Sequence, residues 1–175
     1  MMLRSATCSL VIAALTAGCL KAQPNRKSQL ASVNQVVSNA KIEIVYRRPV
    51  ARGRELFGAL VPYGKIWTPS ADSAAVFTTS SDIDIAGQKL KKGSYAMWMV
   101  PDSTEWAVVF SSDAHVFHLA RPGQKDEALR VKVKSQQSGD HMESLGFYFP
   151  MVDADSAVLV MHWGKTVVPL AIKAR

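Results

Sequence analysis

The chain has 175 residues, a length that suits a single domain with a substantial core. Its composition, 48% hydrophobic and 20% charged, is that of a globular protein and excludes an intrinsically disordered chain. The formal net charge of +7 favours anionic partners such as phospholipid or acidic polysaccharide, but the basic residues are scattered, which equally fits a solvated basic surface.

The N-terminal segment is typical of an exported protein. Arg4 precedes a short apolar run, Ser9–Ala17, which is shorter than the ~20 residues of a membrane-spanning helix. The run leads into Thr16-Ala17-Gly18-Cys19, which resembles the bacterial lipobox, with Thr16 where leucine is preferred. We interpret residues 1–18 as a lipoprotein-type signal peptide and Cys19 as the lipidated residue. The alternative is ordinary cleavage nearby, such as after Ala22.

These signals predict a location in the cell envelope. A lipid on Cys19 would anchor the protein to a membrane, either facing the periplasm or in the outer membrane, whereas a chain without lipid would be secreted. Removal of the signal peptide takes Cys8 with it, so neither a disulfide nor a thiol nucleophile is expected in the folded domain. Export and the lack of an aromatic and basic platform argue against nucleic acid as a partner.

Residues 19–39 are predicted to form a flexible tether between the lipid and a domain that spans residues 40–175. The segment is polar and rich in small residues, as linkers are. Four apolar residues within it have helical spacing, which leaves open a short turn of helix or an edge segment: Leu30, Val33, Val36 and Val37.

From residue 40 onward the pattern is that of β-strands. Ile42, Ile44 and Tyr46 alternate with other residues, as in a half-buried strand, and residues 94–100 are apolar on both faces, as in a central strand. Gly164-Lys165 suggests a turn between two further strands. About nine strands separated by turn signals predict an all-β fold, an antiparallel β-sandwich that is jelly-roll-like or barrel-like.

Two long segments, residues 47–72 and 112–128, interrupt the strands. Loops of this length in a compact domain are commonly functional or mobile. They contain Asp72, His115 and His118, which leaves open an envelope hydrolase or a metal-dependent enzyme as the alternative function. No metal-binding motif and no catalytic serine elbow accompanies them, so we predict no metal and no cofactor, and a binding role is favoured.

The first long segment has the most uneven composition. Its arginines can recognise carboxylates or phosphates with forked hydrogen bonds, and nearby aromatic rings can stack on a ligand. In the alternative, the arginines pair with buried carboxylates or carbonyls, while Phe57, Tyr63 and Trp67 plug one end of the sandwich. We predict a face that binds an anionic or saccharide ligand, formed by Arg48, Arg54, Tyr63, Trp67 and Asp72.

The residue order in this segment resembles the DUF2911 family, a bacterial domain of unknown function. The matching motifs are Y-x-R-P-x-x-x-G-R-x-x-F-G from Tyr46 to Gly58 and L-V-P-Y-G-x-x-W from Leu60 to Trp67, followed by Gly93-Ser94-Tyr95. The resemblance covers about residues 40–172 and implies an exported or lipid-anchored β-domain with no established reaction. Family members often follow the tryptophan with R-x-G-A-N, where this chain has T-P-S-A-D at residues 68–72.

Overall fold

The structure, a computed structural model, describes residues 27–175. The predicted signal peptide, Cys19 and the first part of the predicted tether lie outside the described residues. Among the described residues, no helix is long and apolar enough to cross a membrane. The elements are β1 (Gln29–Val37), β2 (Ala40–Arg48), β3 (Ala75–Thr79), β4 (Ile83–Ile85), β5 (Gln88–Leu90), β6 (Gly93–Val100), β7 (Glu105–Ser111), a 3-10 turn (Gln124–Asp126), β8 (Glu127–Lys134), β9 (Gln136–Val152) and β10 (Ser156–Ala174).

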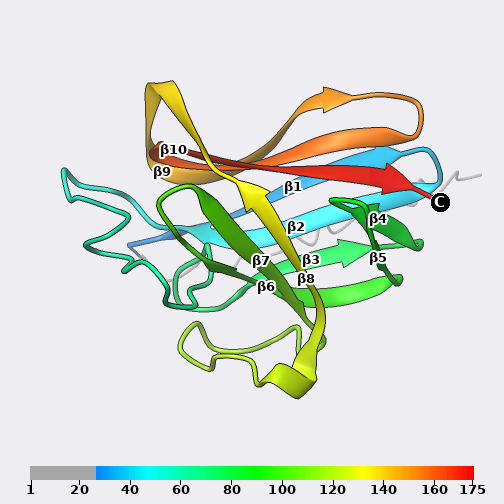
Figure 1. The fold of residues 1–175 in the computed structure, drawn as a ribbon, viewed down its shortest axis with the longest axis horizontal. Helices are drawn as coiled ribbons and strands as arrows, with labels where there is room; N and C mark the ends of the chain where they lie inside the picture. The colour runs from blue at the N-terminus through cyan, green and yellow to red at the C-terminus, as the bar shows by residue number, and fades with distance from the viewer. Residues whose placement is uncertain (1–26) are drawn as a thin grey trace, which may run out of the picture.

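The strands form two antiparallel sheets that face each other (Figure 1). The first sheet has six strands in the order β1-β2-β3-β6-β7-β8, and the second has four in the order β5-β4-β10-β9. The predicted antiparallel β-sandwich is therefore confirmed, with ten described strands where the sequence suggested about nine.

The main core lies between the sheets and is built by alternation along each strand. In β2, Ile42, Ile44 and Tyr46 are buried as predicted, and the same period places Phe77 of β3 and Phe110 of β7 in the core. Because successive side chains of a strand point to opposite faces, this pattern gives each sheet one buried face.

Strand β6 is buried on both faces. It lies between β3 and β7, and Met97 and Met99 face the main core. Trp98 points to the other side of the sheet, where Val116 of the loop after β7 and Ile66 of the loop after β2 cover it. The prediction of a central strand is confirmed, and the sandwich has a second, smaller core on its outer face, formed by Ala74, Ala96, Trp98 and Val109.

The domain begins earlier than residue 40. Residues 29–37, predicted as part of the tether, form β1, which pairs with β2 from Gln29 opposite Arg48 to Val37 opposite Ala40. The helical spacing of the four apolar residues was misleading, and the alternative of an edge segment was correct. Val33 and Val37 face the core, while Leu30 and Val36 on the other face are exposed.

Gly164 does not end a strand as predicted. β10 continues through it as one strand of 19 residues, and the pairing with β9 shifts register on both sides of Gly164. Its φ of +59° suits glycine, and a Cβ at this position would lie 2.8 Å from Leu56 Cδ1. The glycine is therefore the residue of a bulge and not of a turn.

Candidate functional site

The five predicted site residues do not meet in one cavity. Arg48, at the end of β2, lines a polar cavity between β2 and the β9–β10 pair. Asp72, just before β3, lines a separate groove on the outer face of the six-stranded sheet. The predicted face is thus divided between two places, the end of β2 and the last part of the loop before β3.

Arg54 stabilises its own loop. Its Nε donates a hydrogen bond to the Ala51 carbonyl (2.9 Å), and its Nη2 donates to the Val50 carbonyl (2.6 Å). Such side-chain donors satisfy loop carbonyls that no strand pairs. This geometry corresponds to the structural alternative for Arg54.

Trp67 belongs to an aromatic cluster at one end of the main core. Its ring stacks on Trp163 with centroids 5.9 Å apart, and Phe57 packs edge-on against Trp67, Trp163 and Trp106. Its backbone exchanges two hydrogen bonds with Met99 of β6. The ring is half-buried and acts as a plug, which also corresponds to the structural alternative.

Tyr63 lies on the surface with 48% of its area exposed. Its ring covers Gly58, where φ is +96° and a Cβ would lie 3.0 Å from Tyr63 Cε2. The motif glycine therefore serves the turn and the close approach of the tyrosine ring.

The polar cavity around Arg48 has a volume of about 510 Å³, within the range of small-molecule sites. Arg48 Nε donates to the Leu145 carbonyl (2.9 Å) and Nη2 donates to the Ser144 carbonyl (3.3 Å), so two backbone groups of β9 fix the guanidinium plane. Both Nη1 hydrogens have no hydrogen-bond partner among residues 27–175. The cavity is lined by Arg48, Ser138, Asp140, His141, Met142, Glu143, Ser144, Tyr148 and His162.

His162 and Tyr148 form a hydrogen-bonded pair in this cavity. The imidazole is only 5% exposed; its Nε2 lies 3.1 Å from the Gly164 carbonyl and its Nδ1 lies 3.3 Å from Tyr148 Oη. Because a carbonyl only accepts, Nε2 carries the proton, and in the neutral ring Nδ1 accepts from the tyrosine hydroxyl. The lone pairs of Tyr148 Oη are then available to accept a hydrogen bond from a ligand.

Glu143 adds a fixed negative charge to the same cavity. Its Oε1 accepts from the Arg52 backbone N–H (2.6 Å), and its Oε2 lies 3.1 Å from His141 Nε2. The hydrogen bond from the Arg52 backbone and the one from His141 hold the pKa of Glu143 below its usual value. The cavity therefore offers a cationic donor and an ionised carboxylate together.

The groove at Asp72 lies under the loop that follows β7 and has a volume of about 570 Å³. Val45, Val76 and Phe117 form apolar walls, and Asp72 and His115 are among its polar residues. The structure therefore brings two residues of the alternative enzyme hypothesis into one groove.

His118, the third of them, contacts Asp72 through its backbone, since its N–H donates to the Asp72 carbonyl (3.4 Å). No group of three metal-ligating side chains occurs within residues 27–175. The hydrolase hypothesis stays a prediction.

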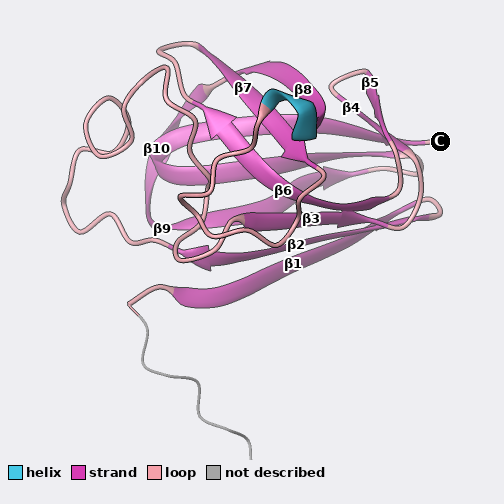
Figure 2. Cartoon of the chain, turned by 90° about the horizontal axis from the view of Figure 1, so that it is seen from below, coloured by secondary structure: helices cyan, strands magenta, loops and turns pink. Residues whose placement is uncertain are grey.

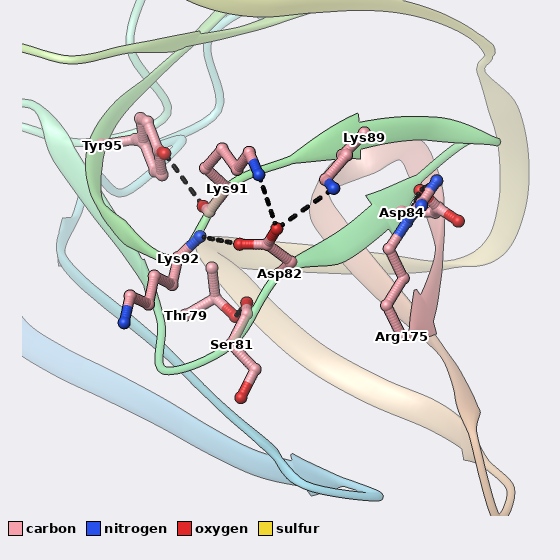
Figure 3. A network of polar contacts seen from close by, with 9 residues as sticks. All are labelled: Thr79, Ser81, Asp82, Asp84, Lys89, Lys91, Lys92, Tyr95 and Arg175. Atoms are coloured by element: carbon pink, nitrogen blue, oxygen red, sulfur yellow. Dashed lines mark hydrogen bonds and ion pairs between the residues drawn. The ribbon is translucent and has the colours of Figure 1, made fainter.

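A third polar cluster joins the β4–β5 hairpin to the start of β6 (Figure 3). Asp82 Oδ1 accepts from the Lys92 backbone N–H (3.0 Å), and its Oδ2 contacts Nζ of Lys91 (3.0 Å) and of Lys89 (3.2 Å). Arg175 pairs with Asp84 (2.6 Å), which connects the last described residue to β4. These charges are used to close the hairpin, so the cluster is a structural one.

Tyr148 and His162 were not among the predicted site residues. They lie on neighbouring strands, where Tyr148 opposes Val160 and the β9–β10 register shifts twice near His162. The contact between Tyr148 and His162 depends on this shifted pairing of β9 with β10, and no local sequence motif indicates such a pairing.

The fold and these cavities define a two-sheet antiparallel β-sandwich with a polar, ligand-sized cavity beside the end of β2. The chain belongs to the family described as protein of unknown function, DUF2911, whose sequence model matches residues 28–172. The resemblance seen in the sequence is confirmed. The matched residues include β1, in agreement with the structure, in which β1 is part of the folded domain. No curated protein and no solved structure matches the chain.

Proposed function

We propose that this protein is a cell-envelope binding module that holds a small acidic saccharide, or a similar hydroxyl-rich anion, in the polar cavity. The observation that carries the proposal is the Arg48 guanidinium, which two β9 carbonyls orient and whose Nη1 hydrogens have no partner among the described residues. A guanidinium held in this way is ready to bind a carboxylate or phosphate.

The other cavity residues supply the groups that a saccharide needs. The hydroxyl of Tyr148 and the carboxylates of Glu143 and Asp140 can accept hydrogen bonds from ligand hydroxyls. A purely anionic ligand such as phosphate would place negative charge beside two carboxylates. A ligand with one acidic group and several hydroxyls satisfies both kinds of cavity residue, which is why a uronic acid is the favoured chemistry.

The binding test compares glucuronate with glucose and with inorganic phosphate by titration calorimetry. Tyr148→Phe keeps the ring but removes the hydroxyl, so we expect the dissociation constant for glucuronate to rise about tenfold, the value of one hydrogen bond. Arg48→Lys should weaken binding at least as much, because lysine lacks the fork.

Arg54→Lys is the matched control, since within residues 27–175 the Arg54 side chain donates only to carbonyls of its own loop. The ligand proposal fails if wild-type protein binds none of the three probes, or if Tyr148→Phe and Arg48→Lys bind glucuronate as wild type does.

Membrane attachment through a lipid on Cys19 is the second part of the proposal, and its support is the lipobox-like sequence that ends at Cys19. Cells that express the chain would be fed an alkyne-labelled fatty acid. We expect label on the wild-type protein and on Cys8→Ala, and none on Cys19→Ala. Equal labelling of wild type and Cys19→Ala, or no labelling of any form, would contradict lipidation while leaving the cavity test unaffected.

A further inference from the structure

The two sheets have four edge strands among the described residues, and they differ in how they are protected. Exposed edges are templates for pairing with another chain, and proteins usually protect them with charges, prolines, bulges or short length. β8 carries Arg130, Lys132 and Lys134. β5 is three residues long and contains Lys89, and β9 has register shifts along its pairing with β10.

β1 has none of these protections. Its sequence, QLASVNQVV, contains no charged residue and no proline, and its pairing with β2 runs without a register shift over nine residues. Figure 2 draws β1 as the outermost strand of its sheet, with no described segment along its outer edge. Local contacts are present in β1, among them a hydrogen bond from Gln35 Nε2 to the Val36 carbonyl (2.9 Å).

β1 also has two exposed apolar side chains on its outer face. Leu30 is 47% exposed and Val36 is 55% exposed, and both point away from the main core that Val33 and Val37 face. They lie symmetrically about Val33, three residues before it and three residues after it. Solvent-exposed apolar residues placed symmetrically on an unprotected edge strand form a self-complementary pattern.

We infer that β1 pairs antiparallel with β1 of a second copy of this chain, with Val33 on the two-fold axis. In this register Leu30 of each copy opposes Val36 of the other copy. The dimer therefore contains two Leu30–Val36 pairs, which give every exposed apolar side chain of β1 an apolar partner. Ser32 opposes Asn34, a pair that can form a hydrogen bond. The absence of charge along β1 means that no like charges meet across the axis.

The register is selective. A slip by one residue would place each Leu30 and Val36 against a side chain on the wrong face, because strand side chains alternate. A slip by two residues would place Leu30 opposite Asn34 or beyond the end of β1. The pairing joins two six-stranded sheets edge to edge. Because one pair of strands buries less surface area than a standard protein–protein interface, we expect a weak, reversible dimer.

The test is disulfide cross-linking in cells that express the full-length chain with Val33→Cys. Residues directly opposed in an antiparallel pair have Cα atoms about 4.5–5.5 Å apart, within the range of a disulfide. We expect an oxidant to give a covalent dimer on a non-reducing gel. Lys132→Cys on the opposite edge strand, and the chain without an added cysteine, are the controls and should give several-fold less.

Charge substitutions then test the register. Leu30→Glu alone and Val36→Lys alone, each added to Val33→Cys, should lower the cross-linking yield several-fold. The combination of Leu30→Glu and Val36→Lys should restore the yield, because each glutamate then faces a lysine of the other copy. Within one copy the two positions lie six residues apart along a strand, so restoration cannot come from a contact inside the chain.

A yield from Val33→Cys no higher than that of the controls would overturn the inference. So would a double variant that cross-links no better than the single variants, or a yield that the charge substitutions leave unchanged. Resistance to proteolysis, measured for every variant, checks that the domain is folded. The readout does not depend on the ligand, so its failure is distinguishable from failure of the proposed function.

Discussion

Gly164 combines two requirements in one residue of β10. Its φ of +59° costs other residues about 1–2 kcal/mol, and a Cβ would come within 2.8 Å of Leu56 Cδ1, a clash that costs about 1–3 kcal/mol to relieve. We therefore expect Gly164→Ala to lower the free energy of unfolding by about 2–5 kcal/mol, measured by urea denaturation.

Gly53 provides the matched control for this prediction. Its φ is +68°, and a Cβ there would have no atom within 4 Å. Gly53→Ala should therefore lower the free energy of unfolding only by the cost of the backbone conformation, about 1–2 kcal/mol. Equal losses in the two variants would mean that the contact with Leu56 relaxes at no cost.

Asp82 gives a prediction about pH. The hydrogen bond from the Lys92 backbone, followed by the contacts with Lys91 and Lys89, lowers the pKa of Asp82 far below its usual value. A carboxylate with a lowered folded-state pKa contributes stability that is complete above its unfolded pKa of about 3.9 and is lost as pH falls toward the folded value. Asp82→Asn should thus be less stable than wild type at neutral pH, with a difference that shrinks below about pH 4.

The measurement is thermal unfolding followed by circular dichroism at a series of pH values. Asp113→Asn, on the exposed loop after β7, is the control and should leave the melting temperature unchanged across the series. A difference in melting temperature between Asp82→Asn and wild type that stays constant from neutral pH down to values near 2 would contradict the prediction. The negative charge of Asp82 would then not be the source of its stabilising effect.

At the residue scale, the sequence was informative about the loop but less so about the cavity. The sequence pointed to the arginines and aromatics between residues 47 and 72, and of these Arg48 lines the cavity. Tyr148 and His162, which line the same cavity, come from the far end of the chain. They meet only because β9 and β10 pair through shifted registers, a property that depends on the whole sheet.

Strand β1 leads to a prediction at the scale of elements. A chain that starts at residue 40, the boundary that composition suggested, would lack β1 and expose the long edge of β2. Burial of Val37, which is fully buried, is alone worth about 1.5–3 kcal/mol. We expect this shorter chain to unfold at lower urea concentration than one that starts at residue 27, by about 2 kcal/mol or more.

The control for the truncation is a chain with β1 retained and Val36→Ser introduced. Val36 is on the exposed face, so this change should leave stability within about 0.5 kcal/mol of the parent. Equal stability of the chains that start at residues 27 and 40 would mean that β1 docks on the sheet without contributing to the folded state.

The elements that were misread share a physical cause. An edge strand needs only one half-buried face, so β1 can be polar enough to look like a tether, and its four apolar residues fit helical spacing by coincidence. Glycine with positive φ occurs both in turns and in bulges, so the sequence around Gly164 does not distinguish them. By contrast, residues 94–100 were identified correctly because apolar residues on both faces require cover on both faces.

At the scale of the molecule, the fold class followed from the alternation of apolar residues and the spacing of turns. The arrangement of the sheets did not, because it depends on pairs that are distant in the sequence. Ile85 of β4 pairs with Ile172 of β10, and β2 pairs with β3 across the long loop. Local patterns predict that a strand forms, but the choice of its neighbour is made by the packing of the complete core.

The position of β10 has a consequence for biosynthesis. It follows all the other described strands in the sequence, yet it lies in the interior of the second sheet, between β4 and β9. While the chain is still emerging from the ribosome, the first sheet has no complete second layer to cover its apolar face. The second sheet therefore cannot close before residues 156–174 are available, so the strands made earlier have to wait for β10 before the two layers can pack.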